Sequence, residues 1–187
     1  MSKTRLAPLG VRCVSSDCKK GLHCFRPKRR KGAPPTPEGA CSSCGAMLID
    51  LERVRRCDPA DVDYTVKAFQ LERVRFAYWH AEIDEHAISH AQKKGLAGLR
   101  AAARGRLEKS IGPAVPAFDG RQTPKAGNAI YYAQHAVAAC CRKCVQAWHG
   151  FPLGQPLTTG QLDYLTGLVM HYIEKRLSKK LVVPVLK

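Results

Sequence analysis

Nine cysteines, most of them in two clusters, constrain this chain more than any other sequence feature. The count is odd, and no apolar run follows the N-terminal Met1-Ser-Lys-Thr-Arg to make a signal peptide. Both facts argue against a disulfide framework. Thiolates held by a metal in a reducing compartment agree better with the pattern, so we expect a cytoplasmic, metal-binding protein. The cysteines are Cys13, Cys18, Cys24, Cys41, Cys44, Cys57, Cys140, Cys141 and Cys144.

The N-terminal cluster has the spacing of a tetrahedral zinc site. It contains Cys13-x4-Cys18 and Cys41-x2-Cys44, the second pair followed by Gly45 in a tight turn that directs two sulfurs inward. A segment of 57 residues with few large apolar side chains needs such a metal in order to fold. We predict one zinc held by Cys13, Cys18, Cys41 and Cys44. Because the first pair is loosely spaced, His23 or Cys24 could replace Cys13 or Cys18, and Cys24 could instead be a small core residue.

Charge indicates the partner. Lys and Arg number 31 against 15 Asp and Glu, so the formal net charge is +16. A positive field of this size attracts polyanions, and counterion release drives their binding. Five cations stand between the two cysteine pairs, where they could contact phosphates rather than base edges. We therefore predict binding of DNA or RNA, with an acidic protein partner as a weaker alternative and a merely solvated loop as the simplest one. These cations are Arg26, Lys28, Arg29, Arg30 and Lys31.

The apolar pattern after Cys57 is helical. It predicts a long helix over 58–95, broken near 76–79, then helices over 96–111 and 129–148 that are separated by a loop, and a short extended tail after Lys180. The fold class is α+β and mostly α, with a small zinc-ribbon-like module over 1–57 and a bundle of about four helices over 58–187. No stretch approaches the roughly 18–20 apolar residues of a membrane span, so no membrane partner is expected. The last helix has the clearest apolar stripe, formed by Leu162, Leu165, Leu168, Val169, Tyr172, Ile173 and Leu177.

The second cysteine cluster is placed on the predicted helix over 129–148. At about 100° per residue, Cys140, Cys141 and Cys144 lie broadly on one side, so either Cys141 or Cys140 could bind a metal together with Cys144. His149 stands where Gly150 ends that helix and could turn back toward the sulfurs. A further histidine could come from the earlier helix. The alternative is that the three cysteines are simply small core residues.

At this point the sequence resembles a known family. The residues that carry the resemblance run from Asp119-Gly-Arg-Gln-Thr-Pro124 through Gln134-His135, the second cysteine cluster and Trp148-His-Gly-Phe-Pro152. They are similar to the signature of the bacterial and phage "domain of unknown function 4186" proteins, over roughly residues 73–178. The family has no established function, and its usual pattern has Thr where this chain has Val137 and Ala139. The resemblance implies a family-typical set of His80, Gln122, Thr123, His135, Cys140, Cys141, Cys144 and His149.

Two hypotheses remain for this set. In the first, a structural zinc is held by His80, Cys141, Cys144 and His149, with His135 and Cys140 in reserve. In the second, the metal keeps an open position and His135 serves as base or ligand in a metal-dependent nuclease. The cysteine-rich shell favours the structural role.

We therefore predict a zinc-stabilised nucleic-acid-binding protein, with one zinc and room for a second, and favour a non-enzymatic role while leaving a metal-dependent phosphodiesterase open. The alternatives are the nuclease and a protein-interaction adaptor of a phage or host-defence system. No Walker loop, Gly-rich dinucleotide fingerprint or Ser-His-Asp arrangement can be found from residue spacing.

Overall fold

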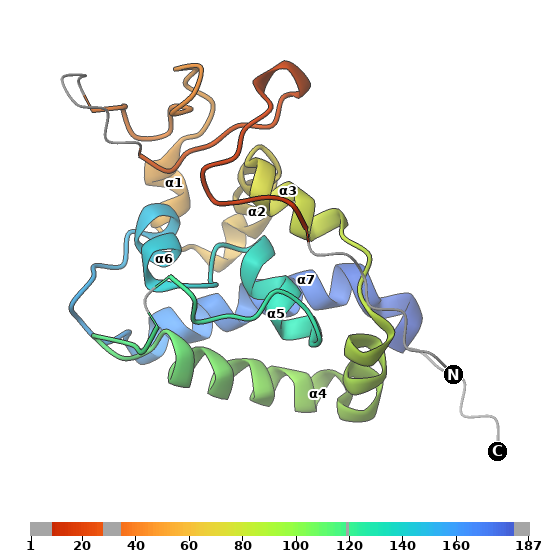
Figure 1. Ribbon diagram of the computed structural model, residues 1–187. Coiled ribbons are helices and arrows are strands. Elements are labelled where there is room, and N and C mark those ends of the chain that lie inside the picture. The colour runs from red at the N-terminus through yellow and green to blue at the C-terminus, as the bar shows by residue number, and fades with distance from the viewer. Residues whose placement is uncertain (1–8, 28–34, 119, 182–187) are drawn as a thin grey trace.

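The protein is mostly helical in the computed structural model, which describes residues 9–27, 35–118 and 120–181 (Figure 1). This confirms the predicted helical character. Within the described ranges there is no β-strand, only three isolated bridges, so neither the β component nor a bundle of four helices is confirmed. The described helices are α1 (Leu51–Arg55), α2 (Val62–Gln70), α3 (Arg73–His80), α4 (Glu85–Ser110), α5 (Ala129–Ala136), α6 (Arg142–His149) and α7 (Thr159–Leu181), with short 3₁₀ helices at Cys18–Lys20 and Pro59–Asp61.

The core is built around α7, which packs against α4 and α5 (Figure 1). Every residue of the apolar stripe predicted for the last helix is buried. On α4, Leu99, Ala103 and Leu107 recur at four-residue spacing and are fully buried. Their spacing places them on one face of the helix, and this face meets α7.

The helix predicted over 58–95 is divided in the structure. A 3₁₀ turn precedes α2, α3 is separate, and α4 begins at Glu85, where the Asp84 carboxylate accepts a 2.8 Å hydrogen bond from the Ala87 N–H and caps the helix. The end predicted at Gly95 is a kink within α4. Gly95 has φ 61° and ψ 174°, a conformation that glycine adopts without steric cost.

The continuous helix predicted over 129–148 is wrong. The chain leaves the helix after Ala136 and re-enters it at Arg142, and Ala138 has a left-handed φ of 56°. Three side chains bind the carbonyl groups of this break and so replace the lost helical hydrogen bonds. The Arg75 guanidinium donates to His135 O (2.6 Å), His149 Nε2 donates to Val137 O (3.1 Å), and Gln134 Nε2 donates to Ala139 O (3.0 Å).

The N-terminal segment docks onto the turn between α2 and α3. The His23 N–H donates to Leu71 O (2.7 Å), the Arg73 N–H donates to His23 O (2.9 Å), and the Arg73 side chain donates to Ser16 O (2.9 Å). The boundary at residue 57 stays a prediction, although these contacts cross it. Of the tail predicted to be extended after Lys180, Leu181 is instead the last residue of α7, and residues 182–187 lie outside the described residues. Among the described helices, none has the length and apolar character needed to cross a membrane.

Truncating the centre of the α7 stripe tests this packing. Leu165→Ala should lower the free energy of unfolding by about 2–5 kcal/mol, because it removes buried methyl groups and leaves a cavity. Lys175→Ala, at an exposed position of the same helix, should change it by less than about 0.5 kcal/mol. Urea denaturation followed by circular dichroism measures both, and equal effects would contradict the packing described.

Candidate metal centres

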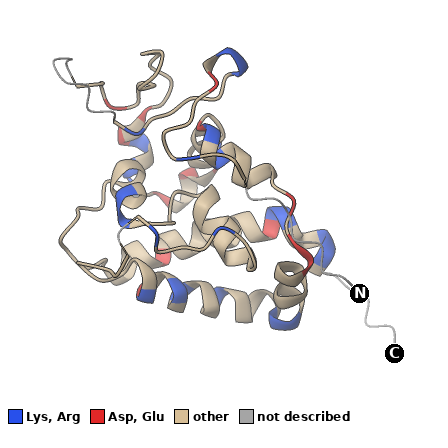
Figure 2. Ribbon diagram, in the orientation of Figure 1, with Lys and Arg blue, Asp and Glu red and all other residues tan. Residues whose placement is uncertain are grey.

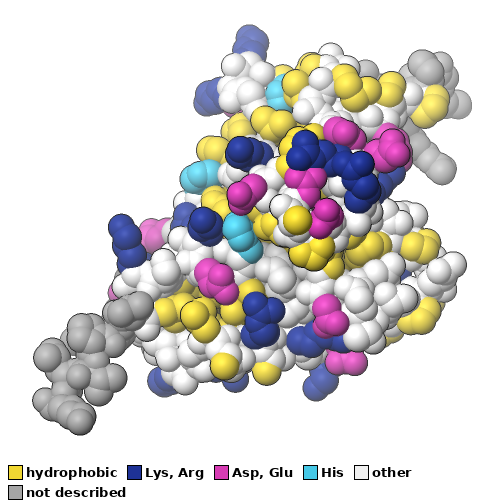
Figure 3. Space-filling view, turned by 180° about the vertical axis from the view of Figure 1, so that it is seen from behind, with side chains coloured by type: hydrophobic (Ala, Val, Ile, Leu, Met, Phe, Trp, Pro, Cys, Tyr) yellow, Lys and Arg dark blue, Asp and Glu magenta, His cyan; other side chains and the backbone are white. Residues whose placement is uncertain are grey.

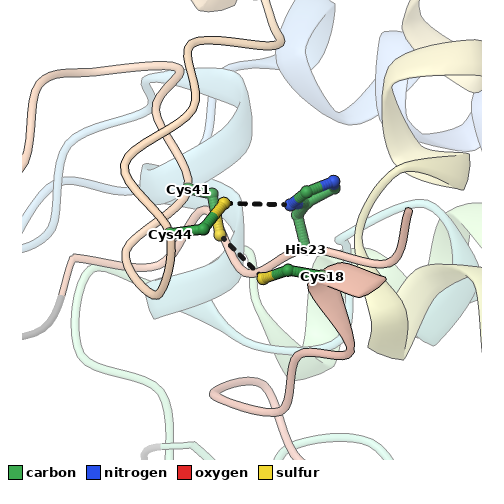
Figure 4. Close-up of side chains that lie close together, drawn as sticks. All are labelled: Cys18, His23, Cys41 and Cys44. Atoms are coloured by element: carbon green, nitrogen blue, oxygen red, sulfur yellow. Dashed lines mark hydrogen bonds between the residues drawn. The ribbon is translucent and has the colours of Figure 1, made fainter. Parts of the chain in front are cut away.

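Four side chains of the N-terminal segment converge on one point (Figure 4). Cys18 and His23 come from the first stretch of chain, and Cys41 and Cys44 from a loop 18 or more residues later. Their ligand atoms all lie within 4.8 Å of one another. The group combines three sulfurs with one imidazole nitrogen, a Cys₃His set that is typical of structural zinc.

The turn at Cys41 shows why the local sequence builds such a site. The Gly45 N–H donates to Cys41 O (2.8 Å) and the Cys41 N–H donates to Ala46 O (2.9 Å), while Gly45 takes the positive φ of 78° that closes the turn. The Ser43 N–H points at Cys41 Sγ (3.4 Å). Although burial raises the pKa of the Cys41 thiol, backbone N–H groups of Cys24, Cys44 and Ser43 lower it to about 6. The turn therefore favours a thiolate, the form that binds a metal.

Two of the six separations match those of a tetrahedral zinc site, and all six are within 4.8 Å. With Zn–S bonds of about 2.3 Å and a Zn–N bond of about 2.05 Å, tetrahedral angles place two sulfurs about 3.8 Å apart and a sulfur and a nitrogen about 3.6 Å apart. Cys18 Sγ and Cys41 Sγ are 3.8 Å apart, and Cys44 Sγ and His23 Nδ1 are 3.6 Å apart. This group could hold zinc.

The group differs from the predicted ligand set at one position. Cys18, Cys41 and Cys44 come together as expected, and His23 stands where Cys13 was predicted. Cys24, the predicted reserve, is fully buried, and its single S–H can donate to the carbonyl group of either Cys13 (3.5 Å) or Arg26 (3.9 Å). The loose Cys13-x4-Cys18 spacing was the signal that His23 could replace one of these cysteines.

The second group is formed by Cys140, Cys141 and Cys144, whose sulfurs also lie within 4.8 Å of one another. All three side chains are buried. Cys140 and Cys141 lie in the break between α5 and α6, and Cys144 lies in the first turn of α6. Cys13 reaches this group from the N-terminal segment, since its sulfur lies 3.9 Å from Cys144 Sγ.

A buried ion pair supports the second group. Arg75 and Glu72 are about 1% exposed, and Arg75 Nε donates to Glu72 Oε2 (2.9 Å), which also accepts from Trp148 Nε1 (3.0 Å). The remaining Arg75 nitrogens point at Cys144 Sγ (3.1 Å) and Cys140 Sγ (3.7 Å). Burial lowers the pKa of Arg75, but Cys144 and Glu72 more than offset this and raise it well above its ordinary value. Sequence reasoning missed both residues, because nothing in their local pattern distinguishes them from a solvated helix face.

The three predicted histidines lie outside both groups. His80 is exposed, and its ring contacts Phe76 and the Phe76 carbonyl. The His135 ring stacks on Tyr78. Its Nε2 lies 3.2 Å from the carbonyl oxygen of Pro124, which follows the family-typical Gln122-Thr123 in the chain. His149 is buried among Phe69, Phe151 and Tyr164, and its Nε2 bonds Val137 O. His149 therefore helps to hold the backbone break that contains Cys140.

The model of the family described as Domain of unknown function (DUF4186) matches residues 63–174, and the chain belongs to that family. The match includes Cys140, Cys141, Cys144 and Arg75, whereas Cys13 and the whole N-terminal metal group precede it. No solved structure matches the chain.

The burial of His149 predicts an acid sensitivity. Burial lowers the pKa of His149 from 6.5 to about 4. Below pH 6.5 the unfolded chain therefore binds a proton that the folded chain excludes. The free energy of unfolding should be highest above pH 6.5 and should decrease as the pH falls toward 4, by roughly 3 kcal/mol at most.

His149→Gln keeps a donor for Val137 O and removes the titrating group. The difference in unfolding free energy between wild type and variant should therefore shrink between pH 6.5 and 4, as measured by urea denaturation. Metal release that is common to both proteins cancels in this difference. His80→Gln, at an exposed site, should keep the wild-type profile, and a pH-independent difference for His149→Gln would contradict the assignment.

Proposed function

We propose that this protein is a zinc-stabilised nucleic-acid-binding protein that contacts mainly phosphates through its basic segment at 26–31. The observation that carries the proposal is the placement of the N-terminal metal ligands. Cys18 and His23 precede the basic segment, and Cys41 and Cys44 follow it. A metal bound by these four residues holds both ends of the segment together, so its cations are presented from a closed loop rather than from a free chain.

Net charge supports a polyanionic partner. The chain carries 16 more Lys and Arg than Asp and Glu. Figure 2 shows Lys and Arg along α4 and toward the end of α7, where Lys93, Lys94, Lys175 and Lys179 are exposed. On the face drawn in Figure 3, basic and acidic side chains are interspersed, so that face offers no single positive patch. This distribution favours the basic segment as the principal contact, with the remaining charge as a long-range field.

The basic segment itself is described only in part. Arg26 is half-buried and lines a narrow gap together with Cys13 and Cys144. Its charge is thus directed in part toward the second cysteine group. Lys28, Arg29, Arg30 and Lys31 lie outside the described residues. Contact between these four cations and phosphate remains our proposal.

Metal content tests the first half of the proposal. Cys41→Ser combined with Cys44→Ser should remove one equivalent of zinc per chain, because half of the Cys₃His ligands are lost. Inductively coupled plasma and native mass spectrometry measure this. Cys57→Ser, which alters a cysteine outside both groups, should retain the wild-type metal content. Unchanged zinc in the double variant would end the assignment.

Salt dependence tests the second half. Replacing Arg29, Arg30 and Lys31 by Gln should flatten the slope of log K against log salt by up to about three units, because each phosphate contact releases roughly one counterion. A charge-matched control replaces Lys175, Lys179 and Lys180, exposed residues near the end of α7, by Gln. It should flatten the slope less. Fluorescence anisotropy with duplex and single-stranded oligonucleotides measures both, and absent or salt-indifferent binding by the wild type would refute the proposal.

The same preparations separate binding from catalysis. The proposal expects plasmid, single-stranded DNA and RNA to stay intact with added Mg²⁺, Mn²⁺ or Zn²⁺. Cleavage that disappears in His135→Ala, while the fold persists, would favour the nuclease instead.

A further inference from the structure

We infer that Cys13 completes a second zinc site, in which four thiolates from Cys13, Cys140, Cys141 and Cys144 join the N-terminal segment to the family domain. Three of these ligands lie within the family match and the fourth comes from outside it. The inference concerns how the chain is held together. It does not depend on nucleic-acid binding and extends beyond the function proposed above.

The separation of Cys13 and Cys144 supports a common metal, whereas Cys13 Sγ lies more than 4.8 Å from at least one of the other two sulfurs, so metal binding requires a small movement of these side chains. The sulfurs of Cys140, Cys141 and Cys144 lie within 4.8 Å of one another, and Cys13 Sγ is 3.9 Å from Cys144 Sγ. The sulfur-to-sulfur edge of a tetrahedral zinc site is about 3.8 Å. An all-thiolate set selects soft metals such as zinc over Mg²⁺ or Ca²⁺, which prefer oxygen ligands.

The backbone is shaped to present these sulfurs. Cys140 and Cys141 stand in the break between α5 and α6, and this break exists because Arg75, Gln134 and His149 bind its carbonyl groups. An uninterrupted helix would satisfy the same carbonyls without burying three polar side chains. Packing alone therefore does not require the break. The break brings the three thiols of the second group close together.

Charge supplies an independent argument. A zinc ion with four thiolates carries a net charge of about −2, which must be balanced when it is buried. Arg75 directs two nitrogens at the sulfurs of Cys144 and Cys140, at 3.1 and 3.7 Å. Arg26 and Lys143 line the same gap beside Cys13. Donors of this kind orient metal ligands and stabilise their thiolate form.

The alternative of small core residues explains less. Cysteines that only fill space would leave the Arg75 guanidinium with Glu72 and the His135 carbonyl as partners, whereas two of its nitrogens also point at the cysteine sulfurs. A disulfide between Cys13 and Cys144 is a second alternative. It would require the two sulfurs to approach from 3.9 to about 2.05 Å. The experiment below distinguishes these possibilities.

The two metal centres would then share one short stretch of chain. Cys13 binds the second centre and Cys18 the first, so residues 13–18 link them. Metal at the second centre fastens the start of this stretch to α6, on the family domain. Loss of that metal should loosen residues 9–17 without unfolding the helical core, which is packed around α7.

Metal counting on the full-length protein tests the inference. Wild type should carry two zinc ions, Cys13→Ser about one, and Cys41→Ser combined with Cys44→Ser also about one. The triple variant should carry none. Cys24→Ser is the matched control, since its hydroxyl can donate to either of the two carbonyls that the thiol faces, and it should carry two zinc ions.

Spectroscopy identifies the ligands. In the Cys41→Ser, Cys44→Ser variant, X-ray absorption at the zinc edge should show four sulfurs at about 2.3 Å and no nitrogen shell at about 2.0 Å. Limited proteolysis of Cys13→Ser should cleave within residues 9–17 at least tenfold faster than in Cys24→Ser, while circular dichroism stays the same.

Three outcomes would overturn the inference. The first is two zinc ions retained by Cys13→Ser. The second is no zinc in the Cys41→Ser, Cys44→Ser variant while its helical circular dichroism persists. The third is a Cys13–Cys144 disulfide in the freshly purified, metal-free protein, detected by mass spectrometry without reduction. Each is distinguishable from failure of nucleic-acid binding, because none of these measurements includes nucleic acid.

Discussion

The buried guanidinium of Arg75 is the interaction on which the rest of the structure depends. Its nitrogens bind the Glu72 carboxylate, the His135 carbonyl and the sulfurs of Cys140 and Cys144, so one charge connects α3, the end of α5 and the start of α6. A buried ion pair rarely adds stability by itself, because desolvation offsets the attraction. Here its hydrogen bonds join these three elements, and moving any one of them would remove partners from a buried charge.

The two cysteine groups are assembled in different ways. The N-terminal group combines ligands from two stretches of chain that lie 18 or more residues apart, and two of its separations are those of a tetrahedral zinc site. The second group needs the break after α5 and lies within the family match. Because Cys13 reaches the second group while Cys18 belongs to the first, the segment between them ties the N-terminal residues to the family domain. Metal binding by these groups and the docking of the N-terminal segment would therefore depend on each other.

The family-typical residues do not form one centre. Cys140, Cys141 and Cys144 converge, whereas His80 lies at the surface and His135 stacks on Tyr78 beside Pro124. His149 acts on the backbone at Val137. The family-typical residues therefore have different structural roles in this chain.

The sequence by itself determined the features that depend on local periodicity and spacing. The α7 stripe, the start of a helical region after Cys57, the Cys41-x2-Cys44 turn and the family could all be predicted, because helical repeats and tight turns involve neighbours in the chain. Tertiary structure decided the rest. The break at 137–141 exists because distant or flanking side chains bind its carbonyl groups, and the choice of His23 over Cys13 depends on how residues 9–27 dock on α2 and α3. The burial of Arg75 could not be predicted, because its partners are supplied by segments up to 69 residues away in the chain.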